Sequence, residues 1–121
     1  MDERRIKTRW GINQGAELTV ENGVKPIPCV VEDISNGGVR LSLRRDLFDE
    51  VFSNFRLAIS GGPELSIGAQ VAWRQRGPES NTYGLSFSSI DNDSLEGLNR
   101  YIRDNFNGLI IKHWWEGSLN A

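Results

Sequence analysis

The 121-residue chain contains few of the residue types from which catalytic and metal sites are usually built. It has one cysteine, Cys29, and one histidine, His113. A single cysteine cannot form an internal disulfide, and Cys29 is expected to be a small buried hydrophobic residue in a strand. A lone histidine provides neither a histidine cluster for a metal nor a histidine-based catalytic triad. No nucleophile, base and oxyanion site converge in the sequence, so we expect no enzymatic activity, no metal and no resident cofactor.

Long hydrophobic runs are also missing. No apolar stretch approaches the ~18 residues of a membrane-spanning helix, and the charged N-terminus lacks the apolar core of a secretory signal. A single free thiol is compatible with a reducing compartment. We therefore expect a cytoplasmic protein that does not insert into a membrane.

Positive charge is not in excess. The chain has 14 Lys and Arg residues against 16 Asp and Glu residues, which gives a net charge of −2. Proteins that bind duplex nucleic acid usually present a basic face, and those that bind single strands combine basic grooves with exposed aromatic side chains. Here the aromatic residues mostly fall on the apolar parity of the predicted strands. A small β-barrel that binds single-stranded nucleic acid is kept as an alternative, but we expect no nucleic-acid polymer as a partner.

What the chain does contain is a succession of short alternating segments separated by turns. Residues 16–31 have the pattern of a hairpin around Asn22-Gly23, a pair that accepts the positive φ angles of a tight turn. Further segments that alternate apolar and polar residues lie at 39–43, 55–60, 64–73 and 83–87. The run from Arg44 to Phe52 is predicted to form a helical turn between two strands. About six strands at this spacing predict an antiparallel sheet that closes, or nearly closes, into a barrel.

The period changes near the end of the chain, where apolar residues recur at helical spacing. These residues are Leu95, Leu98, Ile102, Phe106 and Leu109. Either Asp91 or Asp93 can cap the start of this helix, and Asn107-Gly108 can end it. By length the chain is one domain over residues 1–121. Its expected parts are a charged segment at 1–10, a barrel at 16–88, a helix at 91–109 and a tail at 110–121.

Two polar segments are candidates for a binding site. RRIKTRW, at residues 4–10, places four cations on an end of the chain that precedes the predicted strands. It is either a solvated tail or a segment that folds over an anion. VVEDISNGGVRL, at residues 30–41, places Asp33 and Ser35 two apart, so that an extended backbone directs both to one face. Taken alone, this second segment is more often a hairpin turn whose side chains bond to their own backbone.

The two segments together resemble the PilZ domain family. The resemblance rests on RxxxR, with Arg5 and Arg9, followed by DxSxxG, with Asp33, Ser35 and Gly38. Residues 69–73 and 83–87 are also similar to the last two strands of that family, and the resemblance extends from Arg4 to near Phe106. It implies a mainly β fold, a six-stranded antiparallel barrel with a C-terminal α-helix. It also implies a bacterial receptor for the second messenger cyclic di-GMP.

The resemblance assigns a role to each motif residue. Arg5 and Arg9 would contact phosphate and base, while Asp33 and Ser35 would contact the edge of a guanine. The residue types suit this ligand, because the planar fork of arginine binds phosphate or guanine O6 and N7 bidentately. Gly38 is expected to keep the rim of the site open. An arginine at the position of Arg4 is associated in the family with an intercalated dimer of the ligand; a solvated Arg4 is the alternative.

The four tryptophans complete the candidate set. Trp73 shares the parity of the apolar residues in its strand, so we expect it in the core or at the barrel rim. Stacking on a guanine is the second interpretation, and Trp73 is kept among the ligand-binding candidates. Trp10, which directly follows the second motif arginine, is expected to anchor the charged segment to the barrel. Trp114 and Trp115, in the tail, either pack on the barrel or contact a partner.

A receptor with this fold would signal through its protein surface. Repulsion among the cations of residues 1–10 is expected to keep this segment outside the strands and mobile until ligand phosphates order it. The ordered segment would then change contacts with an unidentified downstream protein. The alternative is an adaptor of the same fold that binds no nucleotide, against which the intact RxxxR and DxSxxG argue.

Overall fold

The computed structural model describes residues 9–20, 25–105 and, in backbone only, 110–111. Each element is bounded by short turns, as the alternating pattern and its Gly-, Pro- and Asn-containing breaks predict. The elements, in chain order, are β1 (Arg9–Val20), β2 (Ile27–Ile34), β3 (Gly38–Leu43), the 3-10 helix η1 (Asp49–Ser53), β4 (Phe55–Ile59), β5 (Glu64–Arg76), β6 (Asn81–Ile90), α1 (Asn92–Asn105) and β7 (Ile110–Ile111).

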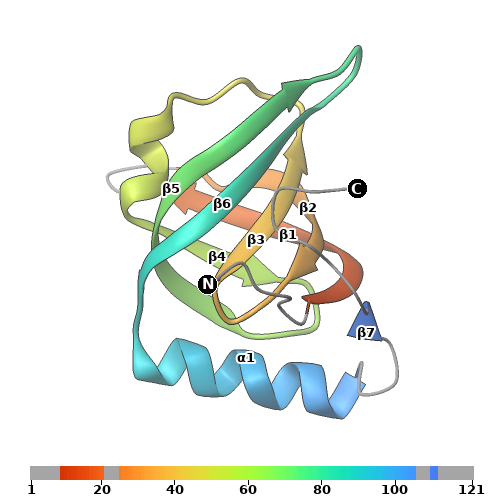
Figure 1. The fold of residues 1–121 in the computed structure, drawn as a ribbon, viewed down its shortest axis with the longest axis vertical. Coiled ribbons are helices and arrows are strands. Elements are labelled where there is room, and N and C mark those ends of the chain that lie inside the picture. The colour runs from red at the N-terminus through yellow and green to blue at the C-terminus, as the bar shows by residue number, and fades with distance from the viewer. Residues whose placement is uncertain (1–8, 21–24, 106–109, 112–121) are drawn as a thin grey trace, which may run out of the picture.

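The first six strands form a closed antiparallel barrel. They pair in the order β2-β3-β6-β5-β4-β1, and β1 also pairs with β2, which closes the sheet. The long β1 serves both neighbours, since its residues 10–18 pair with β2 and its residues 16–20 pair with β4. β7 lies beside the first two residues of β1. Figure 1 shows α1 across one end of the barrel and the β5–β6 hairpin extending beyond the other end.

The barrel interior is filled by the apolar members of the alternating strands. Its fully buried side chains include Leu18, Val31, Leu41, Leu57, Leu65 and Tyr83. Phe52 of η1 packs into the same core, with its ring centroid 5.7 Å from that of Phe55 and 5.2 Å from that of Tyr83. The predicted six-stranded barrel with its C-terminal helix is therefore confirmed, while the predicted helical turn occupies only residues 49–53.

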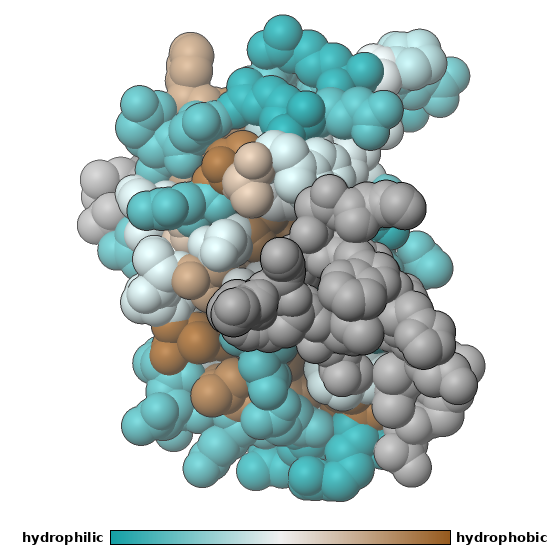
Figure 2. Space-filling model, viewed as in Figure 1, coloured by the Kyte–Doolittle hydropathy of each residue, from teal (hydrophilic) through white to brown (hydrophobic). Residues whose placement is uncertain are grey.

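Helix α1 is attached to the barrel by its cap and by its apolar face. The carboxylate of Asp91 accepts a hydrogen bond from the backbone N–H of Ser94 at 2.7 Å, an N-terminal cap that lowers the pKa of Asp91. The hydroxyl of Ser94 in turn accepts from the backbone N–H of Ser66 in β5 at 2.9 Å. Figure 2 shows hydrophilic side chains over the helix and over the far end of the molecule, with hydrophobic side chains visible between them.

The strands are not regular throughout, and their irregularities decide which side chains face outward. In the β2–β3 pairing, Val31 is opposite Leu41 and Asp33 is opposite Arg40, so Glu32 is an extra residue. A β-bulge of this kind shifts the following residues to the other face of the strand. A second bulge in β5 makes Ala72 the extra residue. In β2 and in β5, the alternation of inward-facing and outward-facing side chains is therefore reversed after the bulge.

Residues of the charged segment at 1–10 are described only from residue 9. The expectation that the whole segment lies outside the strands is wrong for Arg9 and Trp10, which are the first residues of β1. Trp10 pairs with Ile34 of β2 on one side and with Ile110 of β7 on the other. Residues 1–8 lie outside the described residues. Within the described ranges, no helix is both long enough and apolar enough to cross a membrane.

Candidate functional site

The β2–β3 turn carries the DxSxxG motif and is closed by its own hydrogen bonds. The backbone N–H of Ser35 donates to the carbonyl of Gly38 at 2.9 Å, and the N–H of Gly37 donates to the hydroxyl of Ser35 at 3.1 Å. The carbonyl of Gly37 also accepts from the N–H of Phe87 in β6 at 2.9 Å. Ser35 is buried, and here its hydroxyl holds the turn. The serine that was expected to contact guanine thus has a structural task in this conformation, and contact with a ligand stays a prediction.

Gly38 is required by the close approach of β3 to β6. A Cβ atom at this position would lie 2.4 Å from the carbonyl oxygen of Leu85 and 3.5 Å from Nη2 of Arg9. Because the nearer atom belongs to the backbone of a paired strand, it cannot move aside without breaking the pairing. The reason for a glycine here is close packing, together with room for the arginine beside it, more than an open rim.

Asp33 is the centre of a charged cluster on the outer face of β2. The bulge at Glu32 places the carboxylate of Asp33 on the outer face of the barrel. Arg9 and Arg40 cover this carboxylate, so that it is nevertheless fully buried. Oδ1 of Asp33 accepts a hydrogen bond from Nη1 of Arg9 at 2.9 Å. Oδ2 lies 2.9 Å from Nη2 of Arg40 but accepts no hydrogen bond from the described residues. One oxygen of this carboxylate is therefore in an ion pair and still has a free lone-pair direction.

Burial and the neighbouring arginines act on the pKa of Asp33 in opposite directions, and the pKa is raised overall. Burial raises its pKa, while the positive charges of Arg40 and Arg9 oppose that rise. Removing a carboxylate from water is costly, and the two guanidinium groups offset only part of this cost. A ligand that supplied further N–H donors to Asp33 would favour its charged form.

Arg40 is a site residue that the sequence reasoning did not identify. It extends from β3 directly opposite Asp33, with its side chain 36% exposed. Its Nε lies 3.2 Å from a carboxylate oxygen of Glu32 but makes no hydrogen bond. A usable signal was present in the sequence: Ser35 and Gly38 flank Asn36-Gly37, and a hairpin folded at that pair places Arg40 opposite Asp33.

Trp73 lies on the outer face of the barrel, not on the inner face that simple alternation predicts. The bulge at Ala72 reverses the parity of β5 after Val71, and Trp73 becomes the cross-strand neighbour of Gly84. It is 40% exposed. A Cβ atom at Gly84 would lie 2.2 Å from Nε1 of the indole, so the ring rests directly over this glycine. Gly84 is thus a second residue that the sequence reasoning missed.

These residues form one row across the outside of the barrel. Cross-strand partners connect Gly11 to Asp33, Asp33 to Arg40, Arg40 to Gly84 and Gly84 to Trp73. Neighbouring strands lie about 4.8 Å apart, so the three steps from Asp33 to Trp73 span roughly 14 Å of surface. The row offers a carboxylate, a guanidinium and an aromatic ring that lies over Gly84, in that order.

The remaining candidates divide into two groups. Arg9 belongs to the row through its contact with Asp33. Its side chain is buried, so Arg9 is part of the folded barrel. Arg4, Arg5, His113, Trp114 and Trp115 lie outside the described residues.

Cys29 and the acidic residues show no sign of a metal or nucleophilic site in the part of the chain that the structure describes. Cys29 is buried in β2, where burial and the nearby charge of Glu17 raise its pKa to about 12. A thiol with such a pKa is almost never a thiolate near neutral pH. Across residues 9–20 and 25–105, no three His, Cys, Asp or Glu side chains gather as metal ligands.

A family model described as the PilZ domain matches residues 3–104. The chain belongs to the PilZ domain family. The match includes both motifs and all six barrel strands, so the family assignment covers the whole row from Asp33 to Trp73. A search of curated proteins finds no match to this PilZ domain.

Solved structures similar to this PilZ domain share its fold. The Bacillus subtilis inhibitor of motility, MotI/DgrA, is 22% identical, with a TM-score of 0.59 over 89% of this chain and 54% of that one. YcgR from Escherichia coli in complex with c-di-GMP is 14% identical, with a TM-score of 0.60 over 86% of this chain and 46% of that one. The PilZ domain of the same YcgR with c-di-GMP is 15% identical, with a TM-score of 0.57, and 85% of this chain covers 91% of it. This PilZ domain therefore spans about half the length of the first two.

Proposed function

We propose that this PilZ domain is a receptor for cyclic di-GMP and that it acts by binding, without catalysis. Two structural neighbours, both of YcgR, were solved with c-di-GMP. The present chain carries RxxxR and DxSxxG within the family match. The proposal for this chain rests on its own site residues, because the neighbours share only its fold at their level of identity.

The observation that supports the proposal most directly is the pair of unsatisfied atoms at Asp33 and Arg40. Oδ2 of Asp33 and Nε of Arg40 are buried and make no hydrogen bond with the described residues. Buried polar atoms are nearly always hydrogen-bonded, so these two atoms, which are held by ion pairs at 2.9 Å and 3.2 Å without a hydrogen bond, are suited to a further partner. Guanine fits both, since its N1–H and N2–H₂ groups donate and its O6 and N7 atoms accept. Adenine has no pair of adjacent donors for a carboxylate.

The other residues of the row suit the rest of the ligand. The exposed indole of Trp73 offers a face on which a guanine can stack, an interaction worth about 1–3 kcal/mol per base. Arg9, with Arg4 and Arg5 from the preceding segment, would supply cations for the phosphates. If Arg4 joins them, an intercalated dimer of cyclic di-GMP becomes the bound form.

The signal would pass through the N-terminal segment to a downstream protein. Arg9 and Trp10 are already part of β1, so the ligand-dependent change would involve residues before Arg9. In this proposal the ligand recruits those residues to the outer row and alters the surface that a partner meets. Neither a nucleic-acid polymer nor a membrane takes part.

Calorimetric titration with cyclic di-GMP, and with cyclic di-AMP as the matched ligand, tests the proposal. The wild type should bind the guanine dinucleotide preferentially, and Asp33→Ala should lose that preference, because unpaired donors in the wrong ligand are costly. Arg9→Ala and Arg40→Ala should each weaken binding by about 2–5 kcal/mol. Arg56→Ala is the control, since Arg56 is an exposed arginine of β4 whose ion pair with Glu64, at 3.6 Å, is on the surface.

Equal affinity for both dinucleotides would show that Asp33 does not recognise guanine. A wild-type protein that binds neither would leave the adaptor that acts only by protein contacts as the better function. In that case Oδ2 of Asp33 and Nε of Arg40 would be suited to another partner.

A further inference from the structure

A groove lies on β2 and β3, the two strands that carry Asp33 and Arg40, on the other side of the β-bulge. It is an open groove with a volume of about 570 Å³. Its walls come from β2, from the end of β3 and from the β5–β6 turn, and they include Pro28, Val30, Ser42, Arg44, Arg45 and Glu79. Val30 is 40% exposed and projects from the outer face of β2. The groove therefore combines an exposed apolar floor with a charged wall.

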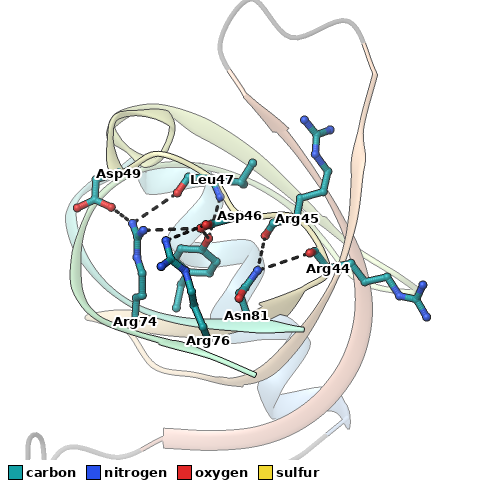
Figure 3. A network of polar contacts seen from close by, with 9 residues as sticks. Arg44, Arg45, Asp46, Leu47, Asp49, Arg74, Arg76 and Asn81 are labelled. Carbon is teal, nitrogen blue, oxygen red and sulfur yellow. Dashed lines mark hydrogen bonds and ion pairs between the residues drawn. The ribbon is translucent and has the colours of Figure 1, made fainter. Parts of the chain in front are cut away.

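Arg44 and Arg45 are held so that their side chains face solvent. The buried side-chain amide of Asn81 donates to the carbonyl of Arg44 at 3.5 Å and to that of Arg45 at 3.1 Å. Figure 3 shows both arginine side chains extending away from the polar network around Asp46. Neither guanidinium makes a hydrogen bond or ion pair with the described part of the chain. Their backbone is thus fixed while their donors are unused.

Asp46 and Asp49, which follow Arg45 in the chain, are already engaged by other arginines. Asp46 lies 2.8 Å from Nη2 of Arg76 and 3.7 Å from Nη1 of Arg74, and it accepts from the hydroxyl of Tyr83 at 3.2 Å. Asp49 pairs with Arg74 (Figure 3). On the groove wall itself, Glu79 is the one carboxylate among the described lining residues, against two guanidinium groups. The described lining residues therefore carry one more positive than negative charge in a protein whose overall charge is −2, while Glu32 and Glu17 adjoin the groove beside Ser42 and Pro28.

We propose that this groove binds an acidic segment of a partner protein, with carboxylates on Arg44 and Arg45 and an aliphatic side chain on Val30. Arginine forks bind carboxylates bidentately, and arginine is enriched at protein interfaces. A nucleic acid would require stacking aromatics, and the described lining residues include none. This inference names a surface and a partner chemistry, and its binding step does not depend on the nucleotide.

The groove is physically joined to the row that contains Asp33. The carboxylate of Glu32 contacts Nε of Arg40 on one side and the hydroxyl of Ser42 on the other. Arg40 and Ser42 are two residues apart on β3, a separation of about 7 Å. A partner in the groove would therefore touch a residue network that also holds Arg40.

The test uses ¹⁵N-labelled full-length protein and an acetylated, amidated hexapeptide that alternates glutamate with leucine. Saturable amide shifts are expected at Val30, at residues 42–45 and at Ser80. Arg44→Glu/Arg45→Glu should weaken binding at least about tenfold, a loss of ~1.4 kcal/mol, and Val30→Glu should do the same from the groove floor. Arg100→Glu/Arg103→Glu, which alters net charge equally on the exposed face of α1, should change affinity less than about twofold.

Four results would overturn the proposal. They are an absence of saturable shifts at millimolar peptide, binding that survives Arg44→Glu/Arg45→Glu, equal binding of the peptide with glutamine in place of glutamate, and matching shifts from a thymidine hexanucleotide when the peptide gives none. Urea denaturation shows that each variant is folded. Because cyclic di-GMP is absent from this titration, its result stands whether or not the nucleotide binds.

Discussion

Adding one methyl group at Gly84 should remove the aromatic end of the proposed nucleotide site without touching any charged residue. In Gly84→Ala the new Cβ atom would lie 2.2 Å from Nε1 and 2.3 Å from Cε2 of Trp73. Both atoms belong to a side chain on the barrel surface, so the indole can lift away while β5 and β6 stay paired. The displaced ring would no longer present the face that the structure shows.

The cost can be estimated from the surface that the ring covers. Trp73 is 40% exposed in its present position, and lifting it would expose on the order of 80 Å² of apolar surface, or about 2 kcal/mol. Replacing glycine by alanine within a strand returns about 0.5–1 kcal/mol. The free energy of unfolding should therefore fall by about 1–1.5 kcal/mol. Loss of one stacked base should weaken cyclic di-GMP by about 1–3 kcal/mol.

A double-mutant cycle with Trp73→Ala separates this effect from general damage. Once the indole is gone, Gly84→Ala should cost less than about 0.5 kcal/mol in stability and should leave affinity unchanged. Urea denaturation and calorimetry measure the two quantities. Gly15→Ala in β1 is the matched control, because a Cβ atom there meets nothing within 4 Å.

The reasoning is refuted if Gly84→Ala binds cyclic di-GMP as tightly as the wild type does. It is equally refuted if the loss of affinity persists unchanged in the Trp73→Ala background. In the first case the seated indole is not part of the site. In the second the methyl group acts on something other than Trp73.

Two further predictions follow from buried ionisable groups. Burial raises the pKa of Asp33 in the folded protein, so the native state binds a proton there at pH values where an unfolded aspartate (pKa ~3.9) has lost it; the contribution of this group to stability should fall as pH rises from about 4 through the raised pKa. Asp33→Asn should flatten this dependence in urea denaturation across that range, and an unchanged slope would contradict it. Burial and Glu17 raise the pKa of Cys29 to about 12, so a thiol reagent near neutral pH should label Cys29 only when the protein unfolds. Labelling of the native protein at the rate of a free thiol would disprove this.

The barrel could be predicted from the sequence because its core follows alternation over long stretches. Leu41, Leu57 and Leu65 are each buried where a period of two residues places them. Helix α1 could be predicted equally well, since Leu98 and Ile102 are four residues apart and both are buried. The described helix extends to Asn105, and the predicted continuation over residues 106–109 lies outside the described residues.

The site was harder to predict from the sequence because it depends on β-bulges that interrupt this alternation. Counting by twos places Trp73 with the core and gives no reason for Gly84, whereas the extra residue Ala72 brings the two together on the outside. Arg40 looked like an ordinary solvent-facing member of its strand, and only the register across the β2–β3 turn shows that it faces Asp33. A single sequence carries no local signal for a bulge as strong as that for a strand, so the pairing of Trp73 with Gly84 needed the three-dimensional structure, whereas a hairpin at Asn36-Gly37 already implied that of Arg40 with Asp33.

The bulge at Glu32 makes the chemistry of this surface depend on the pairing register of β2 as well as on which residues are present. If Glu32 were kept but paired regularly, every motif letter would stay in place, yet the carboxylate of Asp33 would turn to the face of Val31 and Leu41 inside the barrel. A designer who regularised this strand would obtain a smoother sheet with a charge in its core and no binding face. Substitution at the surface of this barrel is therefore a milder change than regular pairing of all the residues of β2, which would remove the bulge.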